Sequence, residues 1–318
     1  MRGVFLDLRT VDRDDLDLTS LRSSVKEWEY HDWTAPDQII ERVRHADIVV
    51  SNKVRLEGIT LRSADRLKLI CIAATGTNNI DLDSCRSLDI TVCNVTGYAT
   101  PSVVEHVYAQ ILSLTRRLTE YRAAVAEGRW QKTDDFCLMD FPIRELKGLT
   151  LGIIGYGELG HAVAGIGVAF GMNILVAERP GSPLRPGRTP LDSLLEKSHV
   201  ISLHCPLTEE TRNLIGGREL GLMRRDAILI NTARGGIVDE AALLAAVRSG
   251  RIAGAAVDVL SEEPPYGDNP LLQVSMPNLL VTPHIAWASI NARQRLIDEI
   301  AGNIRAWLDG TPRNLVCP

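Results

Sequence analysis

The stretch GIIGYGELG, residues 152–160, decides the fold, because an apolar run ends in three glycines spaced Gly155-x-Gly157-x-x-Gly160. The apolar run predicts a strand, and the small and apolar residues that follow, HAVAGIGVAFG, predict a helix. In this context Gly155 permits a tight turn, Gly157 lets a pyrophosphate approach the backbone, and Gly160 lets the helix pack against the strand. The stretch therefore predicts a dinucleotide site.

Glu158 and Leu159 lie inside this turn and belong to the predicted cofactor site. The helix N-terminus offers free N–H groups and a partial positive charge to phosphate. Because Glu158 brings no positive charge, we expect the pyrophosphate to be bound by backbone amides.

Working outward from the turn, short apolar runs alternate with helix-length amphipathic segments, which is typical of parallel α/β sheets. Six runs match the six-stranded doubly wound sheet that binds dinucleotides. These are LTLGIIG (149–155), MNILVAE (172–178), HVISLH (199–204), DAILINT (226–232), AGAAVDV (253–259) and NLLVT (278–282).

The first third of the chain predicts a second sheet of the same kind. A long helix is expected from Thr100 to about Ala126, and another at 289–309. Since residues 1–98 lack a final covering helix, the last helix should return to them. The predicted strands are GVFLDL (3–8), DIVVSN (47–52), LKLICIAA (67–74), ITVCNV (90–95) and, more weakly, SVKEWEY (24–30).

These elements predict two Rossmann-like doubly wound α/β domains. The substrate domain is discontinuous, with residues 1–98 and 290–318, and the NAD-binding domain, 99–289, is inserted in it. Net charge is −5, so nothing favours nucleic acid or an anionic membrane. No signal peptide or bilayer-spanning run is expected, and the predicted compartment is the cytoplasm. The six cysteines form no C-x-x-C pair, so neither a metal site nor a disulfide frame is expected.

Cofactor preference is predicted from the strand that follows the glycine turn. It ends in Glu178, 23 residues after Gly155, where an acid can accept hydrogen bonds from the ribose hydroxyls and repel a 2′-phosphate. This favours NAD(H). Arg179 beside Glu178 can bind a 2′-phosphate, so NADP(H) is not excluded. Alternatively, Glu178 and Arg179 are a solvated pair at a strand end.

Three ionisable residues follow the last three strands of the second series: Arg234, Glu263 and His284. Taken singly, each of them fits a purely structural role: Arg234 as a loop residue, Glu263 as a turn residue and His284 as a helix cap. Ligands of doubly wound sheets, however, bind beyond the carboxyl ends of the strands, where these three should converge. An arginine suits a carboxylate, a histidine suits proton transfer near neutral pH, and a neighbouring carboxylate fixes the tautomer of the histidine.

Several motifs together resemble the D-isomer-specific 2-hydroxyacid dehydrogenase family over essentially the whole chain. They are GYGELG, CPLTEETRNLI (205–215), INTARGGIVDEAAL (230–243), DVLSEEPP (258–265) and TPHIAWAS (282–289). The resemblance implies a catalytic trio of Arg234, Glu263 and His284. It also implies backbone N–H groups for the substrate carboxylate at Thr75 and Gly76. Further cofactor contacts are implied at Cys205, Pro206, Thr211, Thr232, Ala233, Asp258 and Ala286.

Within the family the sequence looks most like glycerate dehydrogenases, also called hydroxypyruvate reductases, because of GTNNID, NVTGYATPS and HIAWAS. This implies a small 2-oxo or 2-hydroxy acid as substrate: glycerate/hydroxypyruvate or glycolate/glyoxylate. Two alternatives stay open. One is an NAD-sensing binding protein like the corepressors that share this fold, and the other is the same chemistry on D-lactate or phosphite.

Other residues carry weaker hypotheses. His204 and Cys205 could suggest a metal, but they lack companion ligands. His106 is expected to serve helix packing or an interdomain contact rather than catalysis. The resemblance implies a homodimer through the nucleotide domain, with Leu138 or Met139 reaching the neighbouring subunit. Two glycines after Arg234 are expected to let the backbone turn away behind it.

Overall fold

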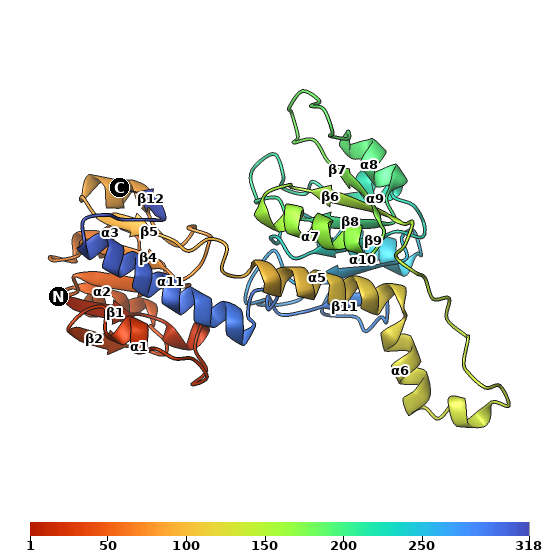
Figure 1. Cartoon of the computed structure of the whole chain (residues 1–318), viewed down its shortest axis with the longest axis horizontal. Helices are drawn as coiled ribbons and strands as arrows, with labels where there is room; N and C mark the ends of the chain where they lie inside the picture. Colours follow the sequence, from red (N-terminus) through yellow and green to blue (C-terminus); the bar gives the residue numbers. More distant parts are fainter. Residues whose placement is uncertain (318) are drawn as a thin grey trace. The chain divides into compact units, whose positions relative to one another are not determined.

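A computed structural model describes residues 1–317 of the chain, which forms two compact units. The first unit combines Met1–Ala99 with the segment that begins at Trp287, and the second unit is Thr100–Ala286. The second unit is therefore an insertion in the first (Figure 1). The expected boundaries lay at 98 and 290, whereas the first unit ends at Ala99 and resumes at Trp287.

The first unit is built on a six-stranded sheet with the order β12-β5-β4-β3-β1-β2. Five strands are parallel, as predicted, but β12 pairs antiparallel with β5, which the sequence analysis missed. Only three residues form this edge strand, too few to give a periodic signal. The strands are β1 (Arg2–Phe5), β2 (Glu27–Tyr30), β3 (Ile48–Ser51), β4 (Leu69–Ile72), β5 (Thr91–Cys93) and β12 (Leu315–Cys317).

Helices cover both faces of this sheet. The predicted return of the last helix is confirmed, because Leu296, Ile300 and Ile304 of α11 share one buried core with Ile48 and Leu69. Short helices α2, α3 and α4 lie over the opposite core. The helices are η1 (Leu8–Thr10), α1 (Thr19–Arg22), η2 (Pro36–Gln38), α2 (Ile39–Val43), α3 (Gly58–Arg62), α4 (Leu82–Ser87) and α11 (Ile290–Leu308).

The second unit contains a six-stranded, fully parallel sheet with the order β11-β10-β9-β8-β6-β7. All six predicted strands are present. The order reverses between β6 and β8, which is the switch point where doubly wound sheets bind ligands. Thr189 adds one parallel bridge beyond β7. The strands are β6 (Thr150–Ile154), β7 (Asn173–Val176), β8 (Val200–Leu203), β9 (Ile228–Asn231), β10 (Gly254–Val257) and β11 (Leu279–Val281).

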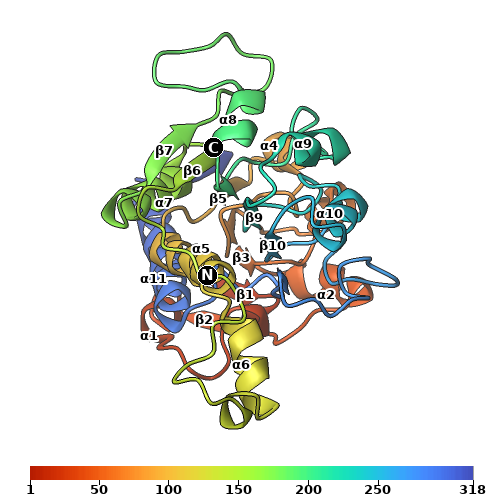
Figure 2. The ribbon, with the colours of Figure 1, turned by 90° about the vertical axis from the view of Figure 1, so that its right-hand side faces the viewer.

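Helices α5 and α7 pack together on one face of this sheet, and α8, α9 and α10 pack on the other (Figure 2). These two layers make the predicted doubly wound arrangement. The helices are α5 (Thr100–Thr115), α6 (Leu118–Ala126), η3 (Trp130–Lys132), α7 (Glu158–Ala169), α8 (Leu191–Lys197), α9 (Gly217–Leu222) and α10 (Glu240–Arg248).

The single helix predicted from Thr100 to Ala126 is wrong. Arg117 adopts the left-handed conformation, with φ 54°, and separates α5 from α6. The carbonyl oxygen of Thr115 accepts the N–H of Arg144. Because that carbonyl is engaged outside the helix, α5 ends there and α6 sets off in a new direction (Figure 1).

Within residues 1–317, every helix is too short or too polar to cross a lipid bilayer.

Candidate functional site

The glycine turn joins β6 to α7 at the switch point of the second sheet. Gly155 has φ 92°, and a Cβ there would lie 2.4 Å from the backbone nitrogen of Cys205. A Cβ on Gly160 would lie 2.0 Å from the carbonyl oxygen of Gly155. Both glycines are therefore required by close backbone approach within the protein itself.

Gly157 differs from the other two glycines, because a Cβ placed on it would meet nothing within 4 Å. It is the N-cap residue of α7, and no side chain caps that helix end. The carboxylate of Glu158 accepts a hydrogen bond from the hydroxyl of Thr100, so it is engaged away from the turn. Free space and free helix N–H groups are what a pyrophosphate needs.

A second observation also fits a bound dinucleotide. Thr232, which follows β9, is buried, and its hydroxyl has no hydrogen-bond partner among the described residues. A buried polar group without a partner costs free energy, and such groups are rare unless a ligand or water satisfies them. Ala233 beside it is buried as well. The residues present therefore fit an NAD-type cofactor at this edge.

The segment after β8 contains three further residues of the predicted cofactor set: Cys205, Pro206 and Thr211. The Thr211 hydroxyl donates to the Pro206 carbonyl at 2.7 Å and accepts the Thr208 N–H at 2.7 Å. The Thr211 side chain therefore holds the backbone of this segment in place. Burial raises the pKa of the Cys205 thiol and lowers that of His204 to about 4, so His204 is a neutral imidazole at neutral pH.

Glu178 follows β7, which ends at Val176, and its main partner is a residue that was not predicted from the sequence. The Arg185 guanidinium lowers the pKa of the Glu178 carboxyl to about 2. Arg179 contributes only its backbone N–H, which donates to Glu178 at 2.8 Å.

Arg234 stands in the turn that follows β9, and Asn231 shapes this turn. The Asn231 side chain accepts the N–H of Ala233 at 3.1 Å and donates to the carbonyl of Arg234 at 3.0 Å. The Arg234 guanidinium donates to the Ala233 carbonyl at 2.7 Å. Arg234 is exposed rather than buried at the sheet edge, so its charge is solvated and available to an anion.

The two glycines after Arg234 serve different purposes. Gly236 has φ 77°, which confirms a turn. Gly235 is needed for a different reason, because a Cβ there would lie 1.8 Å from the carbonyl oxygen of Leu260. The loop that carries Arg234 therefore touches the loop that leads to Glu263.

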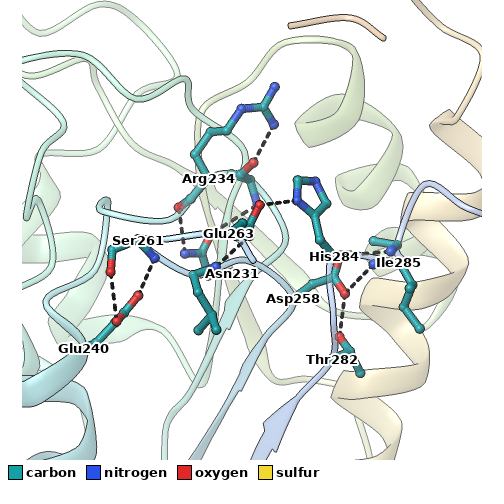
Figure 3. A network of polar contacts seen from close by, with 12 residues as sticks. Asn231, Arg234, Glu240, Asp258, Ser261, Glu263, Thr282, His284 and Ile285 are labelled. Carbon is teal, nitrogen blue, oxygen red and sulfur yellow. Dashed lines mark hydrogen bonds and ion pairs between the residues drawn. The ribbon is translucent and has the colours of Figure 1, made fainter. Parts of the chain in front are cut away.

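Glu263 and His284 form a pair. One carboxylate oxygen of Glu263 accepts the Leu260 N–H at 2.8 Å, and the other lies 2.6 Å from Nδ1 of His284 (Figure 3). The two side chains are 32% and 30% exposed, so the pair is reachable from solvent. With Nδ1 facing a carboxylate, Nε2 of His284 is left to exchange a proton with a substrate.

Asp258 holds the segment that carries His284. Its buried carboxylate accepts the N–H groups of Ile285 at 3.0 Å and Ala286 at 2.9 Å, and the hydroxyl of Thr282 at 2.6 Å. Its backbone carbonyl accepts the N–H of His284 at 2.8 Å. His284 has φ 55°, an uncommon value for a non-glycine residue. These bonds hold His284 in that conformation. Ser102 of α5 adds support by donating a hydrogen bond of 2.7 Å to the carbonyl of Ala286.

Three supporting residues were not predicted from the sequence: Thr282, Gln110 and Glu240. Thr282 links Asp258 to His106, whose Nε2 lies 3.1 Å from the Thr282 hydroxyl. Gln110, one helical turn after His106, lies 3.0 Å from the same ring nitrogen. Glu240 accepts the Ser261 N–H at 2.6 Å and so anchors the loop before Glu263 (Figure 3). The spacing of His106 and Gln110 on a buried helix face was the one available signal.

Thr75 and Gly76 follow β4 in the first unit. The Thr75 hydroxyl donates to the Val95 carbonyl at 2.8 Å. The backbone carbonyl of Thr75 accepts a hydrogen bond from the Asn94 side chain, also at 2.8 Å. Their contact with a substrate carboxylate stays a prediction. Trp287 packs on the core of the first unit and meets Tyr98 edge-on. Among residues 1–317, no group of three His, Cys, Asp or Glu side chains could hold a metal.

Comparison of the sequence with known proteins finds a matching family and named relatives. Residues 108–286 match the family described as D-isomer specific 2-hydroxyacid dehydrogenase, NAD binding domain. The chain is 44% identical to a glycerate dehydrogenase of Methylorubrum extorquens over 308 residues, which are 95% of this chain and 97% of that protein. It is 35% identical to a hydroxypyruvate reductase of Blautia hydrogenotrophica, with 99% of each chain covered.

Solved structures include similar enzymes. The chain resembles a D-lactate dehydrogenase of Aquifex aeolicus, complexed with NAD and lactic acid, with a TM-score of 0.84 and 30% identity over 99% of both chains. The similarity thus extends over both units.

Proposed function

The chain belongs to the D-isomer specific 2-hydroxyacid dehydrogenase family, and on this premise we propose that it interconverts D-glycerate and hydroxypyruvate, with glycolate/glyoxylate as a second pair. The chemistry is reversible transfer of a hydride between NAD(H) and the C2 carbon of a small acid. The observation that carries the proposal is the Glu263–His284 pair, 2.6 Å apart, on the same sheet edge as the exposed cation Arg234.

In the direction of reduction, NADH held at this site would supply the hydride that the carbonyl carbon of the 2-oxo acid accepts. Arg234 binds the substrate carboxylate with its forked donors and polarises the carbonyl. His284 donates the proton that the carbonyl oxygen takes up, and Glu263 orients its ring and stabilises the imidazolium. One 2-oxo acid, one NADH and one proton become one 2-hydroxy acid and NAD⁺.

The cofactor is proposed to lie with its pyrophosphate at Gly157 and its nicotinamide end near Asp258 and Ala286. The open space at Gly157 and the unpartnered Thr232 hydroxyl support this placement. Asp258 already accepts three hydrogen bonds, so its carboxylate is fixed before any ligand binds. Such preorganisation is what an oriented hydride transfer requires.

The test is an activity panel. Purified protein with NADH should bleach the absorbance at about 340 nm when hydroxypyruvate or glyoxylate is added. Pyruvate, longer 2-oxo acids, and phosphite with NAD⁺ complete the panel, and kcat/KM ranks the substrates. Loss of activity in Arg234→Lys, with the fold retained, would support the carboxylate role, because a point charge cannot replace the fork. NADH binding without any turnover would favour the corepressor-like alternative instead.

We also propose a homodimer formed through α6 and the segment after it. This part carries a set of large exposed apolar side chains: Leu118, Trp130, Phe136, Met139 and Ile143. Such residues in one region are typical of protein interfaces. Mass measurement in solution checks this, and Phe136→Asp with Met139→Asp should release monomers. The cytoplasm is proposed as the compartment, since no disulfide joins any of the six cysteines, all of which lie within residues 1–317.

A further inference from the structure

The loop between β7 and α8, which extends at the top of Figure 2, folds back onto Glu178, the acid that follows β7. Arg185 reaches the Glu178 carboxylate with its Nε, 3.1 Å and 3.0 Å from the two oxygens, and with Nη2 at 2.5 Å. The backbone N–H of Arg185 adds a bond of 2.9 Å. The Glu178 side chain is only 6% exposed, whereas Arg185 is 49% exposed. The acid is thus enclosed and the cation is on the surface.

This pairing changes what the acid can do. A carboxylate offers about four lone-pair sites, and those of Glu178 are taken by Arg185 and by the N–H of Arg179. A ribose hydroxyl must therefore displace the Arg185 guanidinium to be accepted by Glu178. The preference for NAD over NADP that an acid at this position implies rests on a free negative charge. Here that charge is neutralised.

The same loop adds further positive charge. It contains Arg179, Arg185 and Arg188 within ten residues, against the single acid Glu178. Arg188 lies with its guanidinium 4.9 Å from the centre of the Tyr156 ring, in the glycine turn itself. A guanidinium matches a phosphate with two parallel hydrogen bonds. This end of the cofactor site therefore has donors suited to a 2′-phosphate.

We propose that Arg185 sets the cofactor preference: its pairing with Glu178 neutralises the charge that would repel a 2′-phosphate, and when Arg185 leaves Glu178 it either frees that acid for the ribose hydroxyls of NAD(H) or binds the 2′-phosphate of NADP(H). The chain then uses both cofactors with similar affinity. The proposal depends on the proposed position of the dinucleotide at the glycine turn. It does not depend on which acid is the substrate.

The experiment measures binding by calorimetry, with ADP-ribose and 2′-phospho-ADP-ribose as probes, so no turnover is needed. In the unmodified protein the two dissociation constants should differ by less than about tenfold. Arg185→Ala should weaken the phosphorylated probe by about 10- to 100-fold and leave ADP-ribose unchanged or tighter, because one charge-assisted contact is lost and Glu178 is unmasked. Glu178→Gln should shift the preference the other way.

Arg218→Ala is the matched control, since Arg218 is also an exposed arginine held bidentately by a carboxylate, that of Asp192. It should leave both dissociation constants unchanged. Equal loss of the phosphorylated probe in Arg218→Ala and Arg185→Ala would overturn the proposal, as would a strict preference for ADP-ribose in the unmodified protein. Tight binding of both probes without turnover of any 2-oxo acid would reject the proposed function but not this inference.

Discussion

Nδ1 of His284 lies 2.6 Å from a carboxylate oxygen of Glu263, and the second oxygen of Glu263 is held by the N–H of Leu260 at 2.8 Å. The histidine ring therefore has a fixed orientation before substrate arrives. Because the backbone of His284 is held in a left-handed conformation by Asp258, the orientation depends on two acids that act on different parts of one residue.

Replacing the carboxylate tests the first of these two contacts. Glu263→Gln keeps the size of the side chain but removes the charge that stabilises an imidazolium. We expect kcat to fall by about 100-fold or more with a much smaller change in KM, because the proton-transfer step loses its support. Steady-state kinetics with hydroxypyruvate and NADH measure both. The control is Glu262→Gln, at the exposed neighbouring acid, which should keep the kcat of the unmodified protein. A similar fall in kcat in this control would show that substitutions disturb the loop rather than the Glu263–His284 pair.

The second contact is tested through Thr282, whose hydroxyl donates to Asp258 at 2.6 Å. Thr282→Val keeps the shape and removes this bond. A hydrogen bond to a charged group contributes about 1.5–3 kcal/mol, so kcat should fall by about tenfold or more as the His284 segment loosens. Thr311→Val, at an exposed site, is the control. Unchanged kinetics in Thr282→Val would show that Asp258 needs no help from this hydroxyl.

The glycine turn allows binding to be separated from folding. A Cβ on Gly157 meets nothing, whereas one on Gly160 would lie 2.0 Å from the Gly155 carbonyl. Gly157→Ala should therefore keep its melting temperature and lose affinity for NADH, since the methyl group fills space meant for the pyrophosphate. Gly160→Ala should melt several degrees lower even without cofactor. The idea fails if Gly157→Ala binds NADH normally.

A pH effect on stability follows from His204. Burial lowers the pKa of this histidine to about 4 in the folded chain, against an ordinary value of 6.5. Between these values the unfolded chain binds a proton that the folded chain does not, so stability is greatest above pH 6.5 and falls as pH drops toward 4. The slope from one such group approaches about 1.4 kcal/mol per pH unit.

Urea unfolding at a series of pH values between 7.5 and 5 measures this slope. His204→Gln should flatten it, whereas His161→Gln, at an exposed position on α7, should leave it as it is. Parallel slopes for all three proteins would mean that His204 does not control acid stability.

Much of the site was predictable because parallel strands bring their carboxyl ends to one sheet edge. Once six strands were recognised, the residues after the last three of them had to be neighbours, and Glu263 and His284 are. The glycine turn was predictable because its spacing reflects backbone contacts, which the structure shows at Gly155 and Gly160.

What could not be predicted depends on contacts between distant segments or on loop conformation. Nothing local marks Thr282 as the link between Asp258 and His106. The pairing of Arg185 with Glu178 depends on how a Pro/Gly-rich loop folds back. The break at Arg117 arises because a carbonyl of α5 is engaged by Arg144, and helical periodicity does not record that.

The hydrogen bond from Ser102 to the carbonyl of Ala286, 2.7 Å long, joins the first turn of the second unit to its last residue. The chain therefore enters and leaves this unit at one point, so that its two ends are side by side. A segment with adjacent ends can be cut out, closed into a circle or reopened elsewhere without disturbing its interior. The second unit thus has the geometry of a segment that can be transferred as a whole, and the Ser102–Ala286 hydrogen bond joins its two ends.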